Sequence, residues 1–198
     1  MKEHYLCLDL EMSGVVPGTH DIIQIAAVLL DEDFKILSEY ESLVFPMYET
    51  TFDPESKKIH GISRSQLNDA PAMEEVLDEL EYWLREEGGY SSRRSMQQLK
   101  ICGQGINNDI SFLKDAYHTV QMSWPFAHQF IDLQDIALYY NRILKANGMK
   151  PSKGVNLSSV AKRLDLSRAG DQHHALEDVR LTAQCLSKLF RKAKEIKL

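Results

Sequence analysis

Four acidic residues have the types and positions that metal chemistry requires. Asp9 and Glu11 lie in YLCLDLEM, Asp109 lies in NNDISFL, and Asp178 lies in HHALEDVR. Gathering carboxylates is costly, because two like charges about 4 Å apart repel by roughly 4 kcal/mol at an effective dielectric near 20. A divalent cation reverses that sign, and carboxylate oxygens are ligands that suit Mg²⁺ or Mn²⁺. The four acids therefore predict a magnesium or manganese site.

The acidic pair near the N-terminus is the strongest part of this pattern. Alternating leucines predict a strand, on which Asp9 and Glu11 share one face about 7 Å apart. An inward-facing acidic pair is unusual, because buried strand positions are ordinarily apolar. Asp109 and Asp178 each lie near a predicted helix start, where an aspartate also serves as a cap or a partner of the helix dipole. For these two residues the structural and the functional interpretations both stand.

A histidine near the fourth acid is a candidate proton acceptor. His173 precedes Asp178 by five residues, so its ring comes from the loop before the last predicted helix. An ordinary histidine pKa near 6.5 lets the imidazole accept a proton from water near neutral pH. An exposed loop histidine without a role is the alternative. His60, in IHGIS, is interpreted as structural or substrate-adjacent.

Cysteine usage argues against zinc. Cys7, Cys102 and Cys185 are far apart, lie in apolar segments and form no CxxC pair, and the chain has no HExxH motif. We expect three buried free thiols.

Length and charge narrow the class of protein. The 198 residues suit one domain over 1–198, and no apolar run approaches the roughly 20 residues that cross a bilayer. The N-terminus lacks the order of a secretion signal, so we expect a cytoplasmic protein. The net charge of −6 argues against coating long duplex DNA, but it permits an enzyme that holds only the last few nucleotides of a strand.

The elements that position these residues follow from periodicity and turn signals. A polar, glycine-broken stretch over 86–98 is predicted as an exposed loop, and caps are expected at Asn107 or Asn108 and at Asp132. This order predicts an α/β, ribonuclease-H-like fold with a mixed five-stranded sheet and helices on both faces. Strands are predicted over 5–12, 22–30, 36–44, 100–105 and 129–133, and helices over 73–85, 107–117, 134–144, 156–164 and from about His174.

Three segments together resemble a known superfamily. DLEMSG, NNDISFL and HHALED resemble the three motifs of the DEDDh, proofreading-type (DnaQ-like) 3′-to-5′ exonucleases, and NLSSVAKRLDL resembles their NL-rich helix. The similarity spans nearly the whole chain. DLEMSG is closer to the oligoribonuclease branch, whereas the rest is nearer to polymerase proofreading subunits. Gln104, Gly105 and Asn108 depart from the second motif of many relatives, at positions that are not metal ligands there.

The resemblance implies a metal site and a catalytic base. Asp9, Glu11, Asp109 and Asp178 would hold two divalent cations, Mg²⁺ or Mn²⁺. His173 would be the general base, because it has the family's five-residue offset from the last aspartate.

The resemblance also implies a substrate and partners. The substrate would be the 3′ end of single-stranded DNA or RNA, released as nucleoside 5′-monophosphates. Met12 and Ser13 would contact the terminal nucleotide, although Met12 also suits packing under the turn. A homodimer or a polymerase partner fits the family, and a membrane does not.

Other interpretations stay open at this point. Candidates for following the phosphate backbone are basic residues that also suit a solvated surface, namely Lys150, Lys153, Arg93 and Arg94. The chain could also be a non-catalytic module that binds nucleic-acid ends, a proofreading subunit, or a metal-dependent endonuclease of the same shape.

Overall fold

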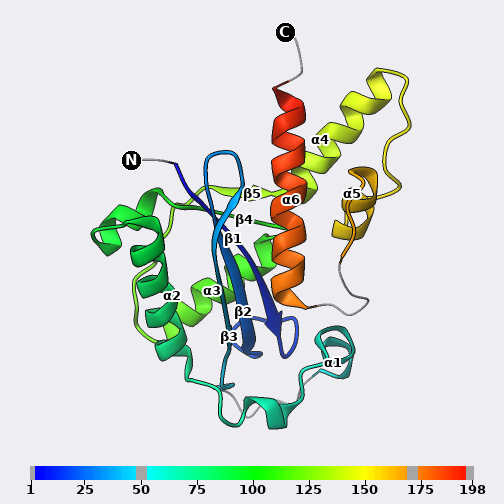
Figure 1. Ribbon diagram of the computed structural model, residues 1–198. Helices are drawn as coiled ribbons and strands as arrows, with labels where there is room; N and C mark the ends of the chain where they lie inside the picture. The colour runs from blue at the N-terminus through cyan, green and yellow to red at the C-terminus, as the bar shows by residue number, and fades with distance from the viewer. Residues whose placement is uncertain (1–2, 48–52, 169–173, 195–198) are drawn as a thin grey trace.

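The structure is a computed structural model that describes residues 3–47, 53–168 and 174–194 (Figure 1). Its elements follow one another along the chain as strands, short helices and long helices. They are β1 (Tyr5–Met12), β2 (Ile22–Leu30), β3 (Ile36–Leu43), α1 (Pro54–His60), η1 (Arg64–Leu67), α2 (Met73–Gly88), η2 (Arg93–Gln98), β4 (Lys100–Gly103), α3 (Asn107–Thr119), β5 (Phe130–Asp132), α4 (Leu133–Ala146), α5 (Leu157–Arg163) and α6 (Ala175–Ala193).

The strands of the described residues form one mixed sheet in the order β3-β2-β1-β4-β5. The first three strands are an antiparallel meander, and β4 and β5 extend it in parallel to β1. This confirms the mixed five-stranded sheet. β1 therefore lies at the centre of the sheet. Its carboxyl end extends beyond the residues that pair with β4.

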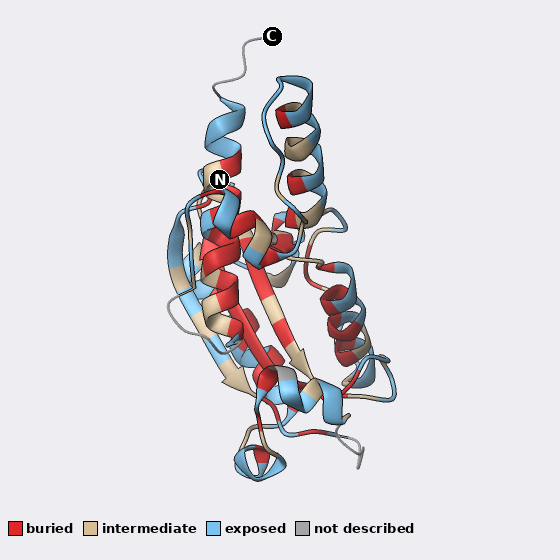
Figure 2. Ribbon diagram, turned by 90° about the vertical axis from the view of Figure 1, so that its right-hand side faces the viewer, coloured by how far each residue is buried: buried red, intermediate tan, exposed pale blue. Residues whose placement is uncertain are grey.

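Helices cover both faces of the sheet, as predicted. One hydrophobic cluster joins the sheet to α2 and α3, and a second joins it to α4, α5 and α6. All nine residues of β2 are buried, because this strand is covered on both faces. Figure 2 shows the buried residues concentrated on the strands and on the inner sides of the helices.

The two faces of β1 differ in a way that decides where the acids point. Leu6, Leu8 and Leu10 belong to the cluster under α2 and α3, whereas Cys7 belongs to the cluster under α6. Successive strand side chains alternate between faces. Asp9 and Glu11 therefore share the Cys7 face, toward α6.

The two expected helix caps had different outcomes. Asp132 is confirmed as the N-cap of α4, where its carboxylate accepts the Gln134 N–H at 2.8 Å and also the Gly105 N–H at 2.9 Å. The prediction of a cap at Asn107 or Asn108 is wrong. Ile106 occupies the cap position without a side-chain bond, because the chain leaves a left-handed turn at Gly105 already in helical conformation.

A short helix was missed in the loop that contains IHGIS. Asp53 accepts the Glu55 N–H at the start of α1, Pro54 begins the helix, and Gly61 ends it in left-handed conformation with φ of 69°. Proline and glycine suit these two ends. The helix has only seven residues and no apolar stripe, so periodicity did not reveal it.

The prediction of an exposed loop over 86–98 is also partly wrong. Helix α2 continues to Gly88, and the 3₁₀ helix η2 occupies most of the rest. Tyr90 and Met96 are buried in the cluster under α2, so this polar stretch contributes to the core.

All three cysteines are buried and free, as predicted. Among the described residues, no helix has the length and apolar character needed to cross a membrane.

Candidate active site

The carboxylates meet where β1 ends and α6 begins. Helix α6 crosses β1 closely enough for the Cys7 Sγ to lie 3.8 Å from the Val179 carbonyl oxygen. Asp178 precedes that contact on the helix, and Asp9 follows it on the strand. In Figure 1 the arrowhead of β1 and the first turn of α6 lie at the same end of the sheet.

Burial and neighbouring acids raise the pKa of both acids on β1. Burial raises the pKa of Asp9 well above its usual value, and the charges of Asp109, Glu11 and Asp178 raise it further. Burial raises the pKa of Glu11 to about 7, with contributions from Asp178 and Asp109. Groups far apart in water would not repel one another measurably, so acids from β1, α3 and α6 lie near each other.

Asp109 is attached directly to the central strand. Its Oδ1 accepts a hydrogen bond from the Leu10 N–H at 3.0 Å, and Asp109 as a whole is only 7% exposed. Parallel pairing of β1 with β4 ends at Cys7, which leaves room for α3 to approach β1 beyond that point. Burial raises the pKa of Asp109 to about 7, although the Leu10 N–H opposes the shift.

Asp178 has a positively charged partner. The Arg168 Nε lies 2.6 Å from Oδ1 and its Nη2 donates to Oδ2 at 2.9 Å. Such a two-pronged contact is a strong form of ion pair. The segment that leads from α5 to α6 thus neutralises one of the four acids.

A groove lies beside the acids. It measures about 550 Å³ and is lined in part by Gln24, Glu41, His60 and His174. Gln24 pairs with Glu11 across β1 and β2, and its side chain donates to Glu41 at 3.0 Å. The His174 Nδ1 lies 3.5 Å from a Glu41 oxygen. His173, the predicted base, lies outside the described residues.

The turn after β1 contains the two predicted substrate contacts. Ser13 is fully buried, and its hydroxyl accepts the Asp21 N–H at 2.9 Å. Its carbonyl accepts the Asp53 N–H at 2.8 Å, which links the turn to α1. Met12 is partly buried against the cluster under α2 and α3. Both residues support the turn, and their contact with a nucleotide stays a prediction.

A comparison with protein families decides the class of this protein. The model of the RNase T exonuclease family matches residues 6–186. The chain belongs to this family. The resemblance to DEDDh, DnaQ-like exonucleases is thereby confirmed, and the exonuclease activity of the family makes the chain a nuclease.

Two curated relatives point to different branches of the exonucleases. The PolC-type DNA polymerase III of Thermotoga petrophila is 29% identical over 192 residues, 97% of this chain but 12% of that protein. The oligoribonuclease of Vibrio cholerae is 29% identical over 144 residues, 68% of this chain and 73% of that protein. The exonuclease thus spans a small part of the polymerase and most of the oligoribonuclease.

A solved structure confirms the ribonuclease-H-like fold. The nuclease domain of 3′hExo, a DEDDh family member bound to rAMP, superposes with a TM-score of 0.76 at 17% identity. The match covers 99% of this chain and 96% of that domain.

The donor chemistry of the exonuclease suits a divalent cation. Members of the family depend on divalent metals, and a cation would relieve the repulsion that raises the pKa of Asp9 and Glu11. Within the described residues, however, no three His, Cys, Asp or Glu side chains are arranged so that they could hold one ion together. Two of the acids are turned to other groups, Asp109 to Leu10 and Asp178 to Arg168.

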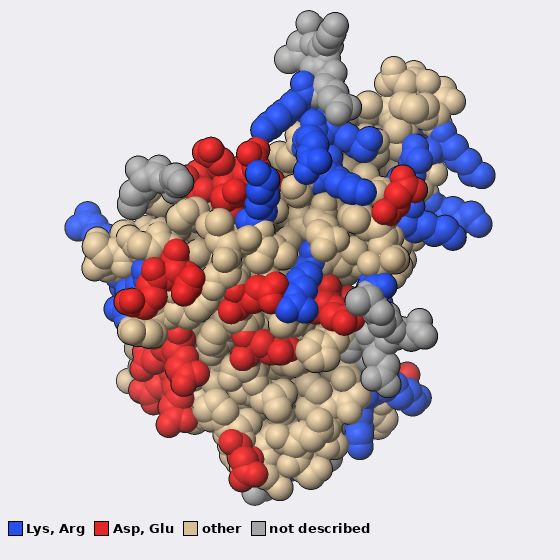
Figure 3. All heavy atoms as spheres, in the orientation of Figure 1, with Lys and Arg blue, Asp and Glu red and all other residues tan. Residues whose placement is uncertain are grey.

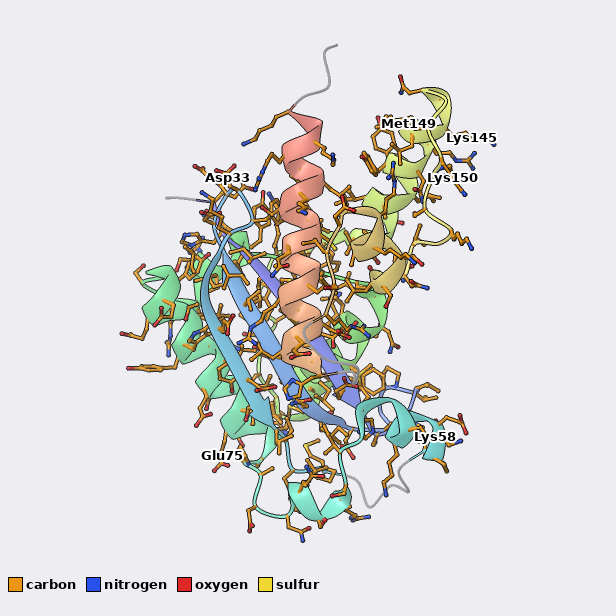
Figure 4. The ribbon with its side chains drawn as sticks, turned by 45° about the vertical axis from the view of Figure 1, so that its right-hand side comes forward. Asp33, Lys58, Glu75, Lys145, Met149 and Lys150 are labelled. Carbon is orange, nitrogen blue, oxygen red and sulfur yellow. The ribbon has the colours of Figure 1, made fainter. Side chains whose placement is uncertain are left out.

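Two of the basic residues considered for phosphate binding, Arg93 and Lys150, lie away from the acids. Arg93 donates to the buried Glu81 at 2.7 Å and to the Ser123 carbonyl at 2.6 Å, so it stabilises the α2 side of the exonuclease. Lys150 lies beside Lys145 and Met149 at the far end of α4, opposite the start of α6 (Figure 4). Figure 3 shows lysine and arginine gathered around that far end, and acidic residues over α2 and β3.

His60 has a structural role in the exonuclease. Its Nδ1 accepts the Ile62 N–H at 2.9 Å, which fixes the turn after α1, and burial lowers its pKa.

Sequence reasoning missed two residues of the site. Arg168 pairs with Asp178, and Glu41 contacts Gln24 and His174. Neither Arg168 nor Glu41 belongs to a sequence motif. A single arginine or glutamate carries no spacing signal, so only the fold reveals these contacts.

Proposed function

We propose that residues 1–198 form a single domain that removes nucleotides from the 3′ end of single-stranded nucleic acid and releases nucleoside 5′-monophosphates. What carries this proposal is the geometry at one end of the sheet, where Asp9 and Glu11 share a face of β1, Asp109 accepts the Leu10 N–H, and Asp178 adjoins the Val179 contact with Cys7. These residues come from three elements, and no structural need of the fold brings four acids together. A cation-dependent reaction gives them a purpose.

The four carboxylates would hold two divalent cations, Mg²⁺ or Mn²⁺. When bound, such ions activate water as a nucleophile and stabilise the charge that develops on the phosphate and on the departing oxygen. Asp109 and Asp178 are buried and Asp9 and Glu11 are half-buried, which limits their contact with bulk water and strengthens their attraction for a cation. The Leu10 N–H occupies only Oδ1 of Asp109, so Oδ2 would be the oxygen offered to an ion.

His173 would act as the general base. Water would attack the phosphorus of the last phosphodiester and give one proton to the imidazole, while the bond from phosphorus to the 3′ oxygen of the preceding nucleotide breaks and that oxygen takes up a proton from solvent to become a hydroxyl. The products are a nucleoside 5′-monophosphate and a strand that is shorter by one nucleotide. His174 would serve substrate or structure instead, since it pairs with Glu41.

The groove beside the acids would receive the terminal nucleotide. Gln24, Glu41 and His174 supply donors and acceptors for a base or a sugar, and Met12 would pack against the last base. Ser13 would contact the nucleotide through the turn that it holds in place. The rAMP in the 3′hExo structure is consistent with a nucleotide product in this fold.

The relatives suggest both RNA and DNA as substrates. Oligoribonuclease similarity over 68% of the chain favours short RNA, and PolC similarity over 97% of the chain favours DNA and a polymerase partner. A second copy of the chain is the other partner that the family suggests.

The test is hydrolysis of matched 5′-labelled single strands of RNA and DNA in Mg²⁺ and in Mn²⁺. We expect a ladder that shortens by one nucleotide at a time, and we expect Asp9→Asn with Glu11→Gln to abolish it. Undiminished release by this double variant would overturn the proposal. Cutting of circular single strands would instead indicate an endonuclease.

Paired histidine variants test the base. His173→Ala should lower turnover by about a hundredfold or more, as expected for loss of general-base catalysis. His174→Ala is the matched control and should retain most of the turnover. The reverse order would move the role to His174.

A further inference from the structure

The ion pair between Arg168 and Asp178 has no place in the proposed reaction. Both carboxylate oxygens of Asp178 face the guanidinium, at 2.6 Å and 2.9 Å. The pair is largely shielded, with side chains 16% and 11% exposed. Buried arginine–carboxylate pairs of this geometry are persistent, since leaving either charge unpaired is costly.

We propose that Arg168 is the counter-charge of the metal-free site and competes with divalent cations for Asp178. The inference rests on the proposed function, because it takes Asp178 as a metal ligand. Arg168 is then a positioning residue that acts through Asp178. It must withdraw before that aspartate can turn toward an ion.

Three observations support competition over cooperation. The guanidinium contacts both oxygens of Asp178, the same two atoms that would bind an ion. No three suitable side chains among the described residues are arranged to hold an ion while this pair is formed. The charge of Arg168 also reaches the strand, because it lowers the pKa of Asp9 against the effect of burial.

The positive charge of Arg168 repels a divalent ion that binds at Asp178. A guanidinium within about 6 Å of a divalent ion repels it, and relief of that repulsion corresponds to between about tenfold and ten-thousandfold in affinity, depending on the effective dielectric. The competition also protects the fold, since it neutralises a buried carboxylate when metal is scarce.

The chain offers a matched control. Arg93 likewise pairs with a carboxylate that is 7% exposed, that of Glu81, but it does so on the α2 side of the sheet. Arg93→Gln should disturb stability much as Arg168→Gln does, without any effect on the metal site.

The experiment measures Mn²⁺ affinity by the electron paramagnetic resonance of free Mn²⁺, without nucleic acid. We expect Arg168→Gln to bind Mn²⁺ at least about tenfold more tightly than wild type, as the weakest repulsion, at the dielectric of water, requires. Arg168→Lys, which keeps the charge but not the two-pronged contact, should lie between them. Arg93→Gln should match wild type. Equal or weaker binding by Arg168→Gln would overturn the proposal.

Nuclear magnetic resonance of the wild-type side chain covers the case in which Arg168→Gln fails to fold. The Arg168 Nε–H signal, assigned by its loss in Arg168→Lys, should shift on titration with Mg²⁺ and saturate together with binding. A signal that stays unchanged while Mg²⁺ binds would overturn the competition. Wild-type protein that binds no ion would instead contradict the metal site of the proposed function.

Discussion

The Asp109 carboxylate accepts the Leu10 N–H at 3.0 Å, which joins residues 99 positions apart. One oxygen thus connects α3 to the central strand, while the negative charge contributes to the acidic site. Asp109 thus has a structural bond to β1 in place of a helix cap, its metal-binding role stays a prediction, and two substitutions separate the two roles.

Asp109→Asn keeps an acceptor for Leu10 but removes the charge. We expect a folded protein whose turnover falls by about a thousandfold, because a cation ligand contributes several kcal/mol to catalysis. Asp109→Ala also loses the hydrogen bond and should be about 1–3 kcal/mol less stable than Asp109→Asn. Urea unfolding and nucleotide release measure the two effects. An asparagine variant with normal turnover would remove Asp109 from the site.

Stability should depend on pH in a characteristic direction when metal is absent. Glu11 and Asp109 have their pKa raised from ordinary values of 4.5 and 3.8 to about 7, chiefly by burial. The folded protein therefore binds more protons than the unfolded chain between these values and about pH 7. The free energy of unfolding should fall as the pH rises through this window.

Urea unfolding in EDTA at pH 5 and pH 8 tests this dependence. The Glu11→Gln and Asp109→Asn double variant should show a flatter profile, and Mg²⁺ should restore stability to the wild type at pH 8. If the free energy of unfolding of the wild type rose from pH 5 to pH 8 by more than that of the double variant, burial of these two carboxylates would not be the cause.

Arg93 should matter for stability and not for substrate binding. Arg93→Gln leaves the buried Glu81 carboxylate without its partner, which typically costs about 3 kcal/mol. Denaturant unfolding measures the loss, and turnover per folded molecule should stay near that of wild type. Unchanged stability with weaker binding of single strands would restore Arg93 as a phosphate contact. Arg94→Gln, at an exposed position, is the control.

Gly103 sets the distance between β4 and β1. A Cβ at this position would lie 2.9 Å from the Leu8 carbonyl oxygen and 2.4 Å from the Ile106 Cδ1. Gly103→Ala should therefore displace the strand next to Asp9, with a loss of about 1–3 kcal/mol and reduced turnover. Gly154→Ala, whose nearest neighbour would lie at 3.4 Å, should change neither. Thermal melting checks both, and a neutral Gly103→Ala would show that the strands adapt.

The sequence predicted the central strands because their patterns are local. Alternation placed Asp9 opposite Leu8 and Leu10, and an apolar run marked β2 as buried on both faces. The Asp132 cap was also local, since the residue precedes its helix directly. Features with a period or a fixed offset can be read from one chain.

The remaining features depend on contacts between distant segments. The short helix α1 buries no regular stripe, and Met96 becomes part of the core only because α2 packs beside it. Arg168 follows α5 and reaches Asp178 on α6 because these two helices pack in one cluster. Such residues follow no periodic rule, so the fold is needed to find them.

Crystals soaked in Mn²⁺ would reveal through the anomalous signal of the ion whether the acids share a metal site. We expect manganese between Asp9, Glu11 and Asp178, with the Asp178 carboxylate turned away from Arg168. Full binding of manganese elsewhere, with the four acids apart and the ion pair intact, would contradict both the metal site and the competition for Asp178.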